Sequence, residues 1–162
     1  MRTICFTGRR PKKLPWGYNE QDERCIKLKK LLEEKIDVAI SEGFCHFISG
    51  MALGVDMFAA EIVINKKKEG QPITLEAAIP HRKQAASWSA EHRKRYKNIL
   101  NCCDKVTFVS KNYTSYCMMK RNYYMVDNSS KVIAVLDDLT GGTGKTVLYA
   151  RSKNVIVDII NI

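Results

Sequence analysis

Short apolar runs alternate with helix-length segments along the whole chain, and this alternation constrains the fold more than any other feature of the sequence. Runs that are apolar along their whole length are typical of parallel strands buried on both faces. They predict strands at about 3–6, 45–49, 73–79, 105–109, 132–136 and 155–160. Apolar residues at helical spacing predict helices between them, at about 20–42, 53–68, 83–100, 118–128 and 143–152.

Such an alternation leaves few ways to arrange the layers. Parallel neighbours need crossover connections, and right-handed crossovers cover both faces of a sheet with helices. We therefore expect an α/β fold, a three-layer α/β/α sandwich with a mostly parallel sheet of about six strands. A chain of 162 residues, 45% of them hydrophobic, is sufficient for one core of ordinary size. Residues 1–162 are thus expected to form a single domain.

Basic residues outnumber acidic ones, 27 to 17, which gives a formal net charge of +10. This charge favours anionic partners and includes nucleic acid among them. The segment 88–97 interleaves aromatic and basic residues, which is typical of a nucleic-acid groove but also of an amphipathic crossover helix. We favour the helix, and we expect nucleic acid to bind only weakly and without sequence preference.

The six cysteines include no Cys-x-x-Cys pair and have no histidine at ligand spacing. We therefore expect reduced thiols that behave as small hydrophobic residues, and no metal site. The apolar runs are too short to cross a bilayer, and Met1-Arg2 leads directly into a strand rather than into a signal peptide. From these features we expect a cytoplasmic protein with no membrane partner.

Glycines follow three of the expected strands, and parallel strands bring their carboxyl ends to one edge of the sheet. Backbone N–H groups and a helix N-terminus at such an edge favour an anion, most often a phosphate. The glycines in question are Gly8, Gly50, Gly54, Gly141 and Gly142. The alternative for Gly50 and Gly54 is that they only permit tight packing between helix and sheet.

Several other side chains near these strand ends allow two interpretations each. Arg10 could bind a phosphate or carboxylate with its forked guanidinium, or it could be solvated. Asp56 could complement a helix dipole, or it could bind a ribose hydroxyl or position a water. In the loop that contains Trp16 and Tyr18, a base or sugar could stack, or the aromatic rings could plug the sheet.

Gly144-Lys145-Thr146 matches the last three residues of a P-loop. However, Leu139 stands where that motif needs its first glycine, and only 16 residues follow Thr146. A P-loop normally opens its domain, because later strands supply the aspartate that holds magnesium. We therefore expect no ATPase activity, and we expect Lys145 either to touch a phosphate or to lie in solvent.

A set of short motifs runs along nearly the whole chain in a fixed order. These motifs are Gly8-Arg9-Arg10-Pro11, the run from Ser49 to Asp56, Tyr113-Thr114 with Cys117-Met118, Arg121-Asn122 with Met125-Val126-Asp127, and Gly141-Gly142-Thr143. Together they resemble the YpsA-like family of the SLOG superfamily, a group of Rossmann-like domains that also includes DprA and the LOG phosphoribohydrolases. Arg9 departs from the family pattern, which usually has histidine at this position.

The resemblance implies that a nucleotide or nucleotide-derived small molecule binds at the carboxyl edge of the sheet. The protein would then act as a sensor or binding module, with no required cofactor. The residues implied as ligand contacts are Gly8, Arg10, Ser49, Gly50, Met51, Gly54, Asp56, Arg121, Gly141, Gly142 and Thr143. No catalytic residue is assigned, and a homo-oligomer is compatible with the sequence.

Two other functions remain as alternatives. The first is hydrolysis of nucleotide N-glycosidic bonds, as in the LOG enzymes that this chain resembles. In those enzymes the glycine motif ends in a catalytic glutamate, whereas this chain has Val147 and Leu148 there, so Asp56 or Glu61 would have to substitute. The second is DprA-like binding of single-stranded nucleic acid, which the net charge supports.

Overall fold

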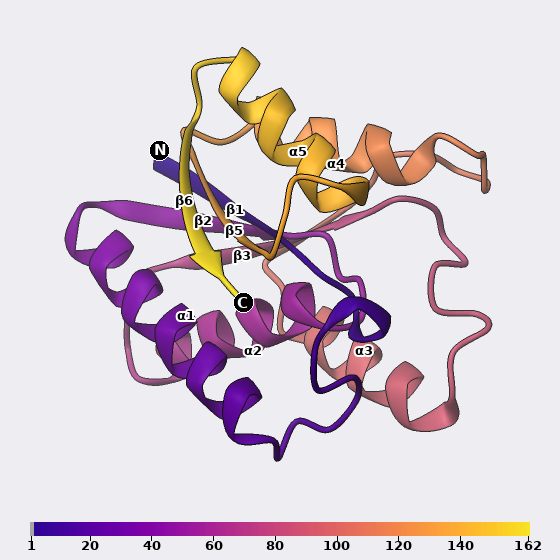
Figure 1. Cartoon of the computed structure of the whole chain (residues 1–162), viewed down its shortest axis with the longest axis horizontal. Coiled ribbons are helices and arrows are strands. Elements are labelled where there is room, and N and C mark those ends of the chain that lie inside the picture. The colour runs from indigo at the N-terminus through magenta and orange to yellow at the C-terminus, as the bar shows by residue number, and fades with distance from the viewer. Residues whose placement is uncertain (1) are drawn as a thin grey trace.

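The computed structural model describes residues 2–162 and places one sheet between two layers of helices (Figure 1). The strands are β1 (Arg2–Gly8), β2 (Phe44–Ser49), β3 (Thr74–Ile79), β4 (Lys105–Phe108), β5 (Lys131–Leu136) and β6 (Ile156–Asn161). The helices are α1 (Glu23–Ser41), α2 (Val55–Lys68), α3 (Ala90–Asn101), α4 (Cys117–Asp127) and α5 (Gly141–Ser152), with a short 3-10 helix at Pro11–Lys13. Every strand and helix expected from the sequence is present, and the predicted α/β class is confirmed.

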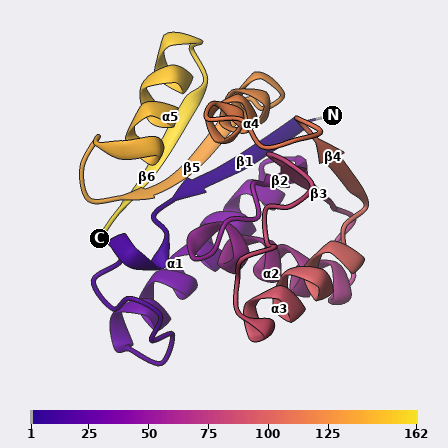
Figure 2. The ribbon, with the colours of Figure 1, turned by 90° about the vertical axis from the view of Figure 1, so that its right-hand side faces the viewer.

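The sheet has six strands in the order β4-β3-β2-β1-β5-β6, and every neighbouring pair is parallel. Figure 2 shows them side by side from β6 to β4. The chain first builds outward from β1 to β4 and then returns to the other side of β1 to form β5 and β6. Right-handed crossovers in opposite directions place helices on opposite faces, so α1, α2 and α3 cover one face and α4 and α5 the other. The strand order therefore reverses between β1 and β5.

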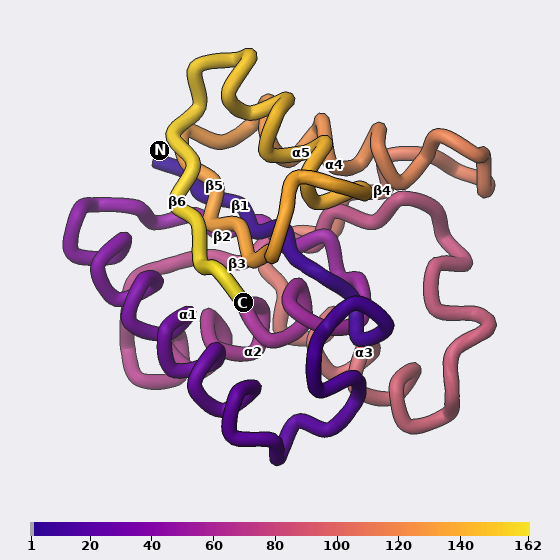
Figure 3. The backbone as a smooth tube through the Cα atoms, viewed as in Figure 1, coloured from indigo at the N-terminus to yellow at the C-terminus, as the bar shows by residue number. Residues whose placement is uncertain are grey.

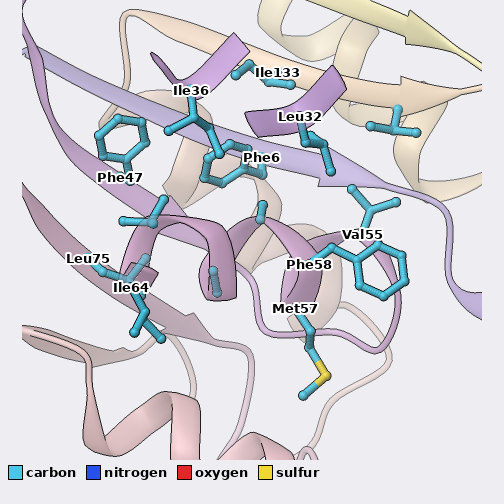
Figure 4. Packing of buried hydrophobic residues seen from close by; sticks show 14 of the residues in the cluster. Phe6, Leu32, Ile36, Phe47, Val55, Met57, Phe58, Ile64, Leu75 and Ile133 are labelled. Carbon is cyan, nitrogen blue, oxygen red and sulfur yellow. The ribbon is translucent and has the colours of Figure 1, made fainter. Parts of the chain in front are cut away.

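The alternation of side chains along the strands fills a separate core on each face. In β1, Phe6 points toward α1 and α2, while its neighbour Cys5 points toward α4 and α5. Figure 4 shows Phe6 packed with Leu32 and Ile36 of α1 in the larger of the two cores. Burial on both faces explains why the strands are apolar along their length.

Two helices begin three or more residues later than the sequence pattern predicts, because polar caps fix their first turns. Helix α1 begins at Glu23, since the Asp22 side chain accepts a hydrogen bond from the backbone N–H of Arg24. Helix α3 begins at Ala90, seven residues later than expected, since Ser89 caps it by accepting from the backbone N–H of His92. The preceding residues 81–88 form turns instead of helix.

The loop after β1 is mainly a hydrophobic plug. Leu14 and Trp16 are buried in the larger core, which confirms that interpretation for them. Tyr18 is exposed and stacks on His92 at 5.5 Å between ring centroids. The aromatic rings of this loop therefore do not form a shared binding surface.

The six cysteines are free thiols, of which Cys5, Cys25 and Cys117 are buried and the other three are partly buried. Within residues 2–162, no group of histidine, cysteine, aspartate and glutamate side chains has the arrangement needed to hold a metal ion. No helix in the same range is both long and apolar enough to cross a bilayer.

Candidate functional site

A cavity of about 330 Å³ lies at the carboxyl edge of the sheet, where the strand order reverses between β1 and β5. The chain can be followed in Figure 3 from β1 into its loop and from β5 into α5. In open parallel sheets, the crevice at such a reversal is where ligands bind. The residues that line it are Thr7, Gly8, Arg9, Arg10, Lys12, Lys13, Ala52, Asp56, Arg121, Asn122, Gly142 and Thr143.

Helix α5 begins at this cavity with its first N–H groups uncapped. Its N-cap residue, Thr140, makes no capping hydrogen bond, because its hydroxyl donates to the Asp138 carboxylate instead. The first turn of a helix leaves backbone donors without partners in the helix. Gly142 lines the cavity, and a Cβ added to it would meet no atom within 4 Å. The positive end of α5 is therefore open to an anion.

Arg121 brings a buried positive charge to the same cavity from α4. The residue is 3% exposed. Its Nη1 donates to the carbonyl of Gly50, and its Nε donates to Oδ1 of Asn122 at 2.8 Å. Its Nη2 has no hydrogen-bond partner among residues 2–162. Burial lowers the pKa of Arg121 and the nearby Asp56 raises it, but an arginine stays charged in proteins. The free edge of this guanidinium suits a phosphate or carboxylate oxygen.

Asp56 is the one carboxylate among the residues that line the cavity. It lies in the first turn of α2, and its Oδ2 accepts from the backbone N–H of Ala52 at 3.3 Å. Burial raises the pKa of the Asp56 carboxyl, and the attraction of Arg121 opposes this rise. A buried carboxyl group beside an arginine can accept a hydrogen bond from a ligand hydroxyl, or can hold a proton.

Arg9 fixes the loop that leads into α5. Its Nη1 donates to the carbonyl of Thr140 at 2.8 Å, and its Nη2 donates to the carbonyl of Asp138 at 2.9 Å. Its Nε donates to Oδ1 of Asp137 at 3.0 Å. The guanidinium is thereby occupied by the protein although it borders the cavity. Arg9, which stands where the family pattern usually has histidine, thus positions the N-terminus of α5.

The residues predicted as ligand contacts fall into two groups. Six of them line the cavity: Gly8, Arg10, Asp56, Arg121, Gly142 and Thr143. The other five lie behind or beside its wall: Ser49, Gly50, Met51, Gly54 and Gly141. The contacts made by the five residues of the second group show the structural role of each residue.

Gly50 and Gly54 make room for other parts of the protein. A Cβ at Gly50 would lie 2.7 Å from Nη1 of Arg121, so the space beside Gly50 holds that guanidinium. A Cβ at Gly54 would lie 2.7 Å from the carbonyl oxygen of Arg9, which also accepts from the N–H of Val55 at 3.4 Å. The first N–H group of α2 is thus already bonded to the protein, and Gly54 has the packing role that the sequence left open. The helix end that remains open to an anion is that of α5.

Ser49 and Met51 hold the turn between β2 and α2. The Ser49 hydroxyl donates to the carbonyl of Asp56 at 2.8 Å and accepts from the N–H of Met51 at 3.2 Å. The Met51 side chain is fully buried in the core.

Gly141, at the start of α5, has φ +69°, and a Cβ there would lie 2.8 Å from Nζ of Lys13. Ser49, Met51 and Gly141 shape the cavity through the backbone.

Sequence reasoning missed several residues that line the cavity. They are Thr7, Arg9, Lys12, Lys13, Ala52 and Asn122. A signal for the two lysines was available, because they follow Arg10 in a basic loop after a strand that ends at the carboxyl edge. Nothing local marks Ala52 as a lining residue, because its position depends on how α2 packs against β1.

The segment that matches the end of a P-loop has a different arrangement. The Thr146 side chain is buried, and its hydroxyl donates to the carbonyl of Gly142 one turn earlier at 2.8 Å. The hydroxyl that would hold magnesium in a P-loop is thus bound within the helix. Lys145 is exposed and is absent from the residues that line the cavity.

A second, larger cavity of about 630 Å³ lies between α2 and α3. Glu61 borders it and binds Arg95, with 2.6 Å between Oε1 and Nη2, and Arg95 also binds Glu20. Glu61 therefore lies outside the cavity at the strand reversal and cannot replace a catalytic glutamate there. Arg95 is likewise held in ion pairs, so it is not free for the nucleic-acid contacts that its sequence position suggests.

Comparison with known proteins places the sequence of this chain in a family. The YpsA family model, described as the YspA SLOG family, matches residues 4–156. The uncharacterized SPbeta prophage-derived protein YoqJ of Bacillus subtilis is 33% identical over 139 residues, which cover 78% of this chain and 81% of YoqJ. The UPF0398 protein of Halalkalibacterium halodurans is 30% identical over 156 residues, which cover 94% of this chain and 82% of that protein.

Two solved structures share the fold at low sequence identity. One is DNA processing protein A from Helicobacter pylori, described for its single-stranded DNA binding mode, and the other is DprA from Streptococcus pneumoniae. Each has a TM-score of 0.65 and 15% identity, and they cover 98% and 100% of this chain. This chain spans 64% and 51% of theirs. Because the family model matches residues 4–156, the chain belongs to the YpsA SLOG family.

Proposed function

We propose that this protein binds the phosphate of a nucleotide or nucleotide-derived small molecule in the cavity between β1 and β5, as a sensor or binding module. One observation carries the proposal: the buried guanidinium of Arg121 and the uncapped N-terminus of α5 border the same cavity. The Nη2 of Arg121, free of partners within residues 2–162, and the backbone donors without partners in the helix both favour an anionic ligand.

The rim of the cavity adds further positive charge from the loop after β1. Arg10, Lys12 and Lys13 all line it, and none of the three takes part in an ion pair within residues 2–162. The volume of about 330 Å³ lies at the lower end of the range for small-molecule sites. Asp56 supplies one acceptor that suits a ribose hydroxyl. A small molecule with a phosphate and a sugar fits these groups better than a large neutral ligand.

The test is titration calorimetry with a panel of nucleoside mono- and diphosphates against the wild-type protein and Arg121→Ala. Charged hydrogen bonds are worth about 1.5 to 3 kcal/mol, so the variant should bind roughly 10- to 150-fold more weakly. Arg93→Ala is a matched control, because Arg93 is an exposed arginine on α3 outside the cavity. Its affinity should equal that of the wild type.

Two results would contradict the proposal. If the wild-type protein binds no member of the panel, the cavity is not a nucleotide site. If Arg121→Ala and Arg93→Ala weaken binding equally, the affinity depends only on the net charge of the protein, and the ligand does not contact Arg121.

Binding of single-stranded nucleic acid is a second candidate function. The net charge of +10 favours it, as do the exposed side chains of Arg93, Lys94 and Lys97 on α3. The Helicobacter pylori protein with this fold is described as a binder of single-stranded DNA. Contacts from exposed side chains should act through counterion release, so the logarithm of the affinity should fall linearly with the logarithm of the salt concentration. Tight binding that survives physiological salt would favour this candidate over the first.

A further inference from the structure

A narrow apolar slot of about 60 Å³ adjoins the cavity along the carboxyl edge of the sheet. Its own lining residues are Leu53, Gln84, Trp88 and Met118, and it shares Arg10 and Ala52 with the cavity. The two spaces are therefore neighbouring compartments of one cleft. One compartment presents cations and backbone donors, and the other presents an indole ring, a thioether and an aliphatic side chain.

The indole of Trp88 is held in place from one side. It meets Tyr96 edge-on, with 5.3 Å between ring centroids and an angle of 84° between the rings. The Tyr96 hydroxyl donates to Oε1 of Gln84 at 3.2 Å, and Nε2 of Gln84 donates to the carbonyl of Gly50 at 3.1 Å. Trp88 remains partly exposed and borders the slot, so it offers a fixed aromatic surface there.

The same chain of contacts connects the slot to the cavity. The carbonyl of Gly50 accepts hydrogen bonds from both Gln84 and Arg121. The aromatic wall of the slot and the guanidinium of the cavity are therefore positioned relative to each other before any ligand binds, which lowers the entropy cost of binding. Both ends of the Gln84 amide are already bonded, so the orientation of this side chain is set before a ligand binds.

Arg10 lies between the two compartments and makes few contacts with the rest of the protein. Its side chain is exposed, and within residues 2–162 its guanidinium has a single hydrogen-bond contact, 3.8 Å from Nη2 to the sulfur of Met118. An arginine can stack on an aromatic ring and bind a phosphate at the same time, because its guanidinium is planar and always charged. Arg10 is placed to do both.

We propose that the slot receives the heterocyclic base of a nucleotide, stacked against Trp88 and covered by Arg10, while its phosphate lies in the cavity. This inference rests on the proposed function and adds to it the place where the base of the nucleotide binds. The slot is too small to enclose a base, so one edge of the ring stays in solvent. All four bases should therefore bind with similar affinity.

The fluorescence of Trp88 provides a direct test. Trp16 is the other tryptophan, and its buried Nε1 has no hydrogen-bond partner within residues 2–162. Trp16→Phe therefore removes the second fluorophore without breaking a hydrogen bond. In this variant, AMP, GMP, CMP and UMP should each change the Trp88 emission at saturation, whereas ribose 5-phosphate should not.

Calorimetry of Trp88 variants tests the same contact by affinity. Trp88→Ala should weaken the binding of the four mononucleotides by about 5- to 150-fold, the range expected for base–aromatic stacking. Its affinity for ribose 5-phosphate should stay within about twofold of the wild type, because no phosphate contact is lost. Trp88→Phe keeps an aromatic ring and should recover most of the nucleotide affinity.

The outcomes separate this inference from the proposed function. If the mononucleotides and ribose 5-phosphate bind with equal affinity, and Trp88→Ala changes neither, the cavity binds phosphate and the slot does not hold a base. If neither kind of ligand binds the wild-type protein, both proposals fail. A loss of ribose 5-phosphate affinity in Trp88→Ala, together with lost helical circular dichroism, would show a structural role for Trp88 and would also overturn the inference.

Discussion

Arg9 binds Asp138 through two parts of that residue, with its Nη2 2.8 Å from Oδ1 and 2.9 Å from the backbone carbonyl oxygen. The two residues are 129 positions apart in the sequence. This contact joins the end of β1 to the loop between β5 and α5, on either side of the strand reversal. It therefore fixes the helix end on which the proposed phosphate site depends.

Arg9→Lys should loosen this loop without unfolding the protein. A lysine keeps the charge but cannot reach the carbonyls of Asp138 and Thr140 together, because its ammonium is a single point. The loss of one charged hydrogen bond, about 1.5 to 3 kcal/mol, should speed amide hydrogen exchange in residues 138–144 by roughly tenfold or more. Exchange in β2 and β3 is the internal control and should not change. Unchanged exchange in the loop would mean that Arg9 does not hold it.

Substitutions at Gly142 test whether the ligand occupies the cavity. Open space surrounds this glycine, and its backbone does not have a positive φ, so a side chain there fits without strain. Gly142→Leu should fill part of the cavity and weaken nucleotide binding by at least about tenfold, since a blocked phosphate loses charged hydrogen bonds. Gly142→Ala is the matched control, with a smaller loss and a stability equal to or slightly above that of the wild type. Tight nucleotide binding by Gly142→Leu would place the ligand elsewhere.

The stability of the protein should depend on the ionisation of Glu76. This residue of β3 lies on the face of the sheet that α4 covers. Its carboxylate accepts from Nε2 of His46 at 2.8 Å, from Thr107 at 2.8 Å and from the Tyr124 hydroxyl at 2.6 Å. Burial alone would raise the pKa of Glu76, but these hydrogen bonds lower it to about 2. Tyr124 lies on α4, so the same contacts anchor the helix that carries Arg121.

A depressed pKa in the folded state means that the unfolded chain takes up the proton first as the pH falls. The stability that Glu76 supplies should be complete above its ordinary pKa of 4.5 and should be lost between 4.5 and about 2. The slope should reach about 1.4 kcal/mol per pH unit. Urea unfolding at pH 5, 4 and 3 should show a smaller loss for Glu76→Gln than for the wild type. Glu34→Gln, an exposed glutamate on α1, is the control and should follow the wild type.

Lys145 should contribute little to ligand binding, because it is exposed and lies outside the residues that line the cavity. Lys145→Ala should therefore bind nucleotides within about threefold of the wild type, less than the effect of one charged hydrogen bond. The protein should not hydrolyse ATP, since Thr146 is bonded to Gly142 and Leu139 replaces the first P-loop glycine. Magnesium-dependent ATP hydrolysis that disappears in Lys145→Ala would contradict both statements.

The sequence predicted the edge of the sheet where the cavity lies, but not the contacts around it. Glycines after three strands indicated the carboxyl edge, and six of the eleven predicted contacts line the cavity there. The sequence left open whether Gly50 and Gly54 bring the backbone close to an anion or only permit packing between helix and sheet. In the fold, the carbonyl of Arg9 and the carboxylate of Asp56 occupy the turn between them, so the open helix end is that of α5. A glycine pattern shows where the backbone can approach closely, but not what approaches it.

The sequence by itself determined the elements and the layers of this protein. Continuous apolar runs and helical patterns are local, and both faces of each strand had to be buried, so the alternation of apolar runs and helices permitted only an α/β sandwich. The tertiary structure alone decided that β5 lies beside β1, with Gly8 opposite Val135. That pairing brings Arg9 to Asp138 and Arg121 to Gly50. Contacts between residues so far apart leave no periodic signal in the chain, because they depend on strand order and on the packing of α4 and α5 over the reversal.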